Sequence, residues 1–157
     1  MENKQIYSLA NTFLYCQNLE YARGFDRLPN NLYQTQQCFG TCSAMKFCDL
    51  RLPGYVTSVA NTSKNPYKAT FAYCSNLEVD VLSLLPANGY LMDEVVFGAI
   101  FNSCPKLTCS DYDKLANMLW NNKHVKFVDS KISSAGTLAA FRQCSAELRS
   151  HVPVSWG

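Results

Sequence analysis

The chain of 157 residues, 48% of them hydrophobic, is long enough for one compact domain and short for two. Its charged fraction of 17% lies below the rough quarter usual in soluble domains, and a formal net charge of +2 does not mark a nucleic-acid binder by composition. The polar first residues lack the apolar core of a signal peptide, and no stretch has the length of a membrane span. We therefore expect a cytosolic protein.

Helical patterns dominate the predicted elements. In chain order, we expect helices over about residues 18–28, 35–47, 75–85 and 110–127, with a shorter one over about 137–149. Pro29 ends the first, and Ser75 with Glu78 forms a capping box at the start of the third. Turn-forming residues between 48 and 74 favour extended chain there, with a short strand at 69–73.

These elements predict an all-α fold, an antiparallel four-helix bundle with a small β-sheet at one end, formed by a single domain over residues 1–157. No segment is recognised as an internal repeat, so a repeat array is not expected.

Eight cysteines are an even number, yet without a secretion signal we expect free, mostly buried thiols. Metal-ligand spacing is missing, so we predict no metal site. Two alternatives stay open. One is a cysteine-rich binding domain, cytosolic or secreted and disulfide-bonded, in which Asn61-Thr62-Ser63 fits a glycosylation sequon. The other is a cysteine hydrolase using His124 or His151, although no nucleophile motif surrounds any cysteine.

Lysines cluster late in the chain. None lies between Lys68 and Lys106, and five follow within 106–131, at positions 106, 114, 123, 126 and 131. Such a cluster is able to bind along a phosphate backbone. The commoner role of such a run of lysines is a solvated helix face.

Several short motifs occur in a collinear order. They are Leu32-Tyr33-Gln34-Thr35-Gln36-Gln37, then Phe47-Cys48-Asp49 with Pro53 and Val56-Thr57, then Tyr67-Lys68, then Leu77-Glu78 with Leu84-Leu85. In this order and at this chain length, the sequence resembles the tobamovirus coat proteins across residues 32–95. The resemblance implies a structural capsid protein with no catalytic residues. Its subunits would assemble into a helical rod around single-stranded RNA, in the virion and the host cytoplasm.

The resemblance also implies site residues. Asp49 and Glu78 match a pair of carboxylates that face each other between subunits. Such a pair would hold a proton or a weakly bound cation such as calcium, so that assembly is favoured at lower pH. For Glu78 the capping box is the alternative role, and for Asp49 an exposed loop position.

For RNA binding the resemblance implies positions at the start of the second helix and on the fourth, namely Gln34, Thr35, Tyr112, Asp113, Lys114, Asn117, Met118 and Asn121. Capping and core packing are the alternative roles of these residues. The family's arginines are missing, replaced at matching positions by Phe39, by residues 86–91, and by Ser110 and Asp111. Phosphate neutralisation would fall to Lys106, Lys123 and Lys126, together with Lys114.

Overall fold

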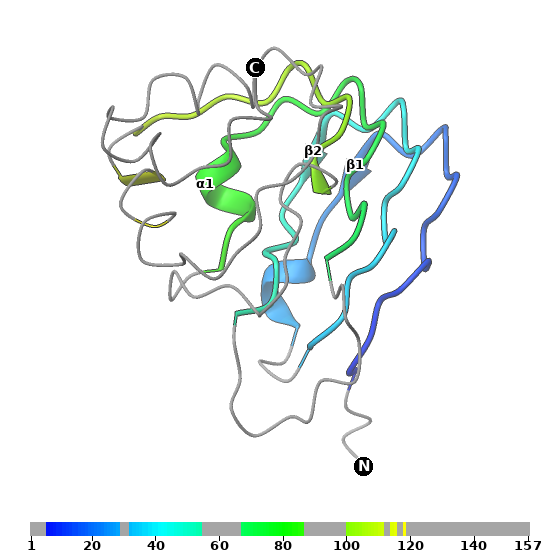
Figure 1. The fold of residues 1–157 in the computed structure, drawn as a ribbon. Helices are drawn as coiled ribbons and strands as arrows, with labels where there is room; N and C mark the ends of the chain where they lie inside the picture. The colour runs from blue at the N-terminus through cyan, green and yellow to red at the C-terminus, as the bar shows by residue number, and fades with distance from the viewer. Residues whose placement is uncertain are drawn as a thin grey trace.

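The described part of the chain is a stack of four coils. The computed structural model describes residues 6–28, 32–54, 67–86, 100–111, 114–115 and 118. We name the first four of these ranges coils 1 to 4. Figure 1 shows the blue, cyan and green segments, which are coils 1 to 3, running side by side in chain order. The described residues therefore form a solenoid, in which each coil contacts mainly its neighbours.

Regular secondary structure is short. In chain order the elements are β1 (Tyr21–Ala22), the 3-10 helix η1 (Phe25–Arg27), β2 (Phe47–Cys48) and α1 (Val81–Leu84). The two strands pair in parallel, with Tyr21 opposite Phe47 and Ala22 opposite Cys48. Two isolated bridges, Ser8–Gln34 and Asp80–Thr108, are also parallel. Parallel pairing between consecutive segments requires the chain to return to its starting side after each coil.

A sequence motif recurs once in each coil. It has the form Phe-x-x-Cys-x-x-(Leu or Met) and occupies residues 13–19, 39–45, 71–77 and 101–107. The chain bends at each motif, because the cysteine N–H bonds to the phenylalanine carbonyl three residues earlier. In coil 2 these are Cys42 N to Phe39 O at 3.1 Å and Met45 N to Cys42 O at 3.0 Å. The expectation that the chain lacks internal repeats was therefore wrong.

The bends place residues in the left-handed region at fixed positions of the motif. The residue two before the phenylalanine has a positive φ in coils 1 to 3, and the residue two after it has one in all four coils. The residues are Asn11, Tyr15, Gln37, Thr41, Ala69, Tyr73 and Ser103. None is glycine, so stacking must offset a local cost of roughly 1–2 kcal/mol at each position.

Backbone hydrogen bonds join the coils in ladders. In coil 1, N–H groups donate to carbonyls of coil 2, as from Phe13 to Cys38 at 2.9 Å. Coil 2 donates likewise to coil 3, as from Phe39 to Thr70 at 2.9 Å. Beyond the motif the direction reverses, and Lys46 N donates to Glu20 O at 2.8 Å. The ladders satisfy backbone groups that the core would otherwise leave unpaired.

The core is a column of aromatic rings. Phe13, Phe39, Phe71 and Phe101 stack nearly parallel, with centroids 5.2, 5.9 and 5.7 Å apart. Phe25 of η1 packs edge-on against the first two rings. The motif's cysteines, leucines and methionine lie beside this column and are mostly buried. One side chain per coil thus builds a continuous core along the stack.

The predicted four-helix bundle is wrong for the described residues. Range 18–28 contains β1 and η1, and range 35–47 contains a series of bends that leads into β2. Apolar side chains such as Phe39, Cys42 and Met45 recur at every third residue. This spacing fits one face of a helix, and it fits equally a chain that bends at every third residue with those side chains turned inward.

The third predicted helix begins later than expected. Asp80, and not Ser75, caps α1, because its side chain accepts a hydrogen bond from Leu82 N at 2.9 Å. The predicted strand at 69–73 is also wrong, since Ala69 and Tyr73 have left-handed backbone.

The fourth predicted helix is described at five residues, of which Lys114, Leu115 and Met118 are helical, whereas Ser110 and Asp111 are not. Its other residues and the range 137–149 lie outside the described residues. Within the described part of the chain, no helix is long and apolar enough to cross a membrane.

Candidate interaction surface

The two predicted interface carboxylates have different roles in the chain. Asp49 binds the start of η1, where its carboxylate oxygens accept the Gly24 N–H at 2.8 Å and the Phe25 N–H at 3.0 Å. Glu78 pairs with Lys106 at 3.0 Å. Each carboxylate therefore has a partner within its own chain. Their predicted meeting between subunits stays a prediction.

The described residues that were predicted to bind RNA differ in burial and in partners. Thr35 is fully buried, and its hydroxyl oxygen lies 3.0 Å from that of Thr70 in the next coil. Gln34 is half-buried and accepts a hydrogen bond from the Ser8 hydroxyl. Lys114 is exposed, and Met118 packs against the core. The other predicted residues, which are Tyr112, Asp113, Asn117, Asn121, Lys123 and Lys126, lie outside the described residues.

The thiols match the expectation for seven of the eight cysteines. These seven are free, and five of them are buried. Burial raises the pKa of Cys42 to about 11 and the pKa of Cys48 and of Cys104 to about 12. The described residues contain no group of histidine, cysteine, aspartate or glutamate side chains suited to a metal ion. The buried thiols are therefore protonated packing groups at neutral pH.

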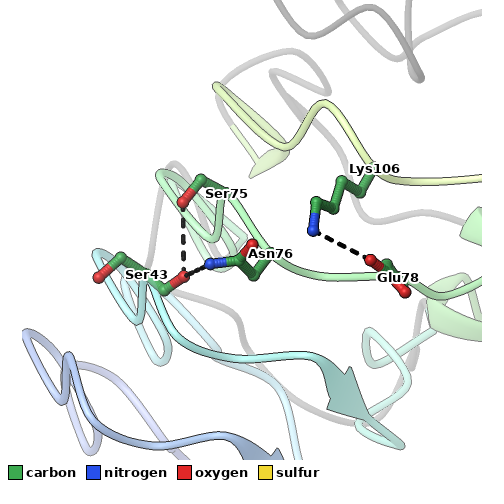
Figure 2. Close-up of polar contacts among 5 residues, drawn as sticks. All are labelled: Ser43, Ser75, Asn76, Glu78 and Lys106. Atoms are coloured by element: carbon green, nitrogen blue, oxygen red, sulfur yellow. Dashed lines mark hydrogen bonds and ion pairs between the residues drawn. The ribbon is translucent and has the colours of Figure 1, made fainter.

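Charges alternate along one side of the stack. Glu20, Lys46 and Glu78 occupy the same motif position in coils 1 to 3. Lys46 pairs with Glu20 at 2.8 Å, and this hydrogen bond raises the pKa of Lys46. Lys106 of coil 4 reaches Glu78, as Figure 2 shows. Beside this pair, Ser75 and Asn76 both donate to the Ser43 carbonyl of the preceding coil. The row is locally close to neutral, because each lysine has a glutamate.

This row shares Lys46 with a group that we call the basic–aromatic cluster, consisting of Tyr21, Arg23, Lys46 and Phe47. Tyr21 is 52% exposed and Phe47 is 37% exposed. The Arg23 guanidinium carbon lies 5.6 Å from the centroid of the Tyr21 ring and 5.2 Å from that of Phe47. Lys46 Nζ lies 5.8 Å from the Tyr21 centroid. These distances are those of cation–π contacts.

The parallel pairing of β1 with β2 creates the cluster. Tyr21 and Phe47 are opposite each other in register, so their side chains project from the same face of the strand pair. Arg23 follows β1 directly and reaches both rings. Sequence reasoning placed these residues in two separate helices and missed the cluster. The signal was the motif itself, because Tyr21 and Phe47 stand at the same distance after its phenylalanine.

Comparisons of the chain with protein-family models, with curated proteins and with solved structures return no significant match. The chemistry of the surface therefore rests on the geometry above.

Proposed function

We propose that this chain is a binding module, in which the stacked coils hold the basic–aromatic cluster as a contact surface for a partner protein. The cysteine-rich binding domain considered above, with its thiols free, is the expectation closest to this proposal. The capsid hypothesis depended on a four-helix bundle, and the described residues lend that bundle no support.

The observation that carries the proposal is the stacking of Arg23 across two exposed aromatic rings. Aromatic and arginine side chains are the residues most enriched at the energetic centres of protein interfaces. Exposed rings held by a neighbouring guanidinium lose little side-chain freedom on binding, and so the entropic cost of contact is small.

The coil architecture supports the same function. In a solenoid, side chains at one motif position recur along the stack and form an extended surface. Here the row of Glu20, Lys46 and Glu78 lies beside the cluster. Its fixed charges would set the orientation of a partner more than the affinity.

Site-specific photo-crosslinking tests the proposal. A photoreactive phenylalanine analogue replaces Phe47, and a matched variant carries it at Tyr15, which is 66% exposed but belongs to the bend of coil 1. In extracts of the source organism, we expect a discrete partner band from position 47 that is absent from position 15. The band should weaken when Tyr21 is also changed to Ala. Equal labelling from both positions would contradict the proposal.

The same experiment tests the capsid hypothesis. If the band from position 47 is the chain itself, and if sedimentation shows disks or rods on acidification, self-assembly replaces binding of a separate partner. Glu78→Gln should then shift the assembly transition to higher pH, because it removes one ionisable carboxylate.

A further inference from the structure

We infer that the basic–aromatic cluster recognises an acidic peptide segment, one that presents an Asp or Glu carboxylate to Arg23 beside an apolar side chain. This inference rests on the proposed function and specifies the chemistry of the partner.

Arg23 carries a charge that the described part of the chain does not pair. The ion pairs found there are Lys46–Glu20 and Lys106–Glu78. The contacts of the Arg23 guanidinium are with the rings of Tyr21 and Phe47. A guanidinium that lies over an aromatic face keeps its N–H edge available for a planar carboxylate.

The carboxylates of Glu20 and Asp49, which lie next to β1 and β2, are already engaged. Glu20 accepts the ammonium of Lys46 at 2.8 Å. Both oxygens of Asp49 accept backbone N–H groups, from Gly24 and Phe25, immediately after Arg23 in the chain. Turning either carboxylate toward Arg23 would break these hydrogen bonds. A carboxylate supplied by a partner is therefore the favoured counter-ion.

The local charges favour a peptide over a nucleic acid. Binding of a polynucleotide requires several unpaired cations along its phosphates. Lys46 of the cluster and Lys106 nearby are each paired with a glutamate, so within the cluster Arg23 is the one cation that no described carboxylate pairs. One arginine flanked by two exposed rings matches a single carboxylate next to an apolar residue. Phosphates spaced along a strand would also meet the carboxylates of Glu20 and Glu78.

Selection from a displayed library of random dodecapeptides, with the full chain as bait, tests the inference. We expect the bound peptides to be enriched in Asp or Glu adjacent to an aromatic or aliphatic residue. Against synthetic versions of these peptides, Arg23→Gln should weaken binding by about tenfold or more, because a charge-assisted hydrogen bond is lost. Arg23→Glu should reverse the preference and select Lys or Arg in place of the acid.

The matched control is Arg27→Gln. Arg27 is also exposed and lies in η1, and no aromatic ring of the described residues contacts it. This variant should bind as the unchanged chain does. Circular dichroism spectra of all three variants should coincide with that of the unchanged chain, since both arginines are on the surface, and the loss of the Arg23 cation–π contacts should lower the Tm only slightly.

The possible outcomes distinguish the acidic-peptide inference from the binding-module function. Peptides that bind without acidic residues, or with unchanged affinity after Arg23→Gln, would overturn the inference and leave the binding-module function standing. If no peptide is selected and position 47 gives no crosslink, both the inference and the binding-module function are overturned. A single-stranded oligouridylate that binds through Arg23, when acidic peptides do not, would overturn the inference in favour of RNA.

Discussion

The Cys74 thiol donates a hydrogen bond to the Phe39 carbonyl oxygen of the preceding coil, with Sγ 3.1 Å from the oxygen. The same contact joins Cys42 to Phe13 at 3.1 Å and Cys104 to Phe71 at 2.9 Å. Each motif cysteine of coils 2 to 4 thus links its coil to the one before. Each of these buried thiols packs in the core and also donates a hydrogen bond to a backbone carbonyl of the preceding coil.

We expect Cys74→Ala to lower the free energy of unfolding by about 1–3 kcal/mol, because it leaves a small cavity and removes one of the two hydrogen bonds to the Phe39 carbonyl, which keeps the Cys42 N–H. Cys74→Ser keeps a donor and should be the more stable of the two variants. Urea denaturation followed by circular dichroism measures both. Cys16→Ala is the control, since Cys16 is exposed and should change stability little. If Ser proves worse than Ala at position 74, the hydrogen bond is not what stabilises the link.

Phe71 lies in the middle of the aromatic column, between Phe39 and Phe101, and is fully buried. Phe71→Ala should cost about 3–5 kcal/mol, the usual range for removing a buried ring. Phe13 stands at the end of the described column and is half-buried, so Phe13→Ala should cost clearly less. Denaturant titration of the two variants gives the comparison, and equal losses would mean that the column does not act as a stack of coils.

The repeated motif of this fold can be found in the sequence, but its three-residue spacing also fits a helix. The motif Phe-x-x-Cys-x-x-(Leu or Met) occurs four times in the described residues, but the segments between its copies differ in length. A search for a fixed period therefore misses it. Free, mostly buried thiols could be predicted from composition, and among the seven cysteines that the structure describes, all are free and five are buried.

The candidate surface was less predictable. Tyr21 and Arg23 are separated from Phe47 by a whole coil, and only the parallel register of β1 and β2 brings them together. Register depends on how each bend turns the chain, and the bends use left-handed residues such as Thr41 and Tyr73, which have no preference for that region. Local propensity therefore favoured helices, and long-range stacking decided the structure.

Alkaline pH should destabilise the chain through its buried thiols. The pKa values of Cys42, Cys48 and Cys104 lie at about 11 to 12, above the 9.0 of a free thiol, with burial as the largest cause. Below pH 9 both the folded and the unfolded chain hold these protons. Above it the unfolded chain releases them and the folded chain does not, so stability falls as pH rises.

Each such thiol should contribute a loss of about 1.4 kcal/mol per pH unit over this window. Urea titrations between pH 8 and pH 11 measure the slope. Cys48→Ala should make it shallower by one thiol's share, because the substitution removes only that thiol. An unchanged slope would show that Cys48 is accessible to solvent in the folded chain.

Thr41 has a φ of 63°, a conformation that a β-branched residue rarely adopts. Its N–H nonetheless bonds to the Ala72 carbonyl at 2.7 Å, so the stack holds it there. Thr41→Asn should stabilise the chain by up to about 1 kcal/mol, since asparagine tolerates the left-handed region without the added unfolded-state entropy of glycine. Thermal unfolding measures the gain as a higher Tm. Thr41→Val keeps the branch at Cβ and should give no gain. A higher Tm for Val than for Asn would show that burial at this half-buried position outweighs backbone strain.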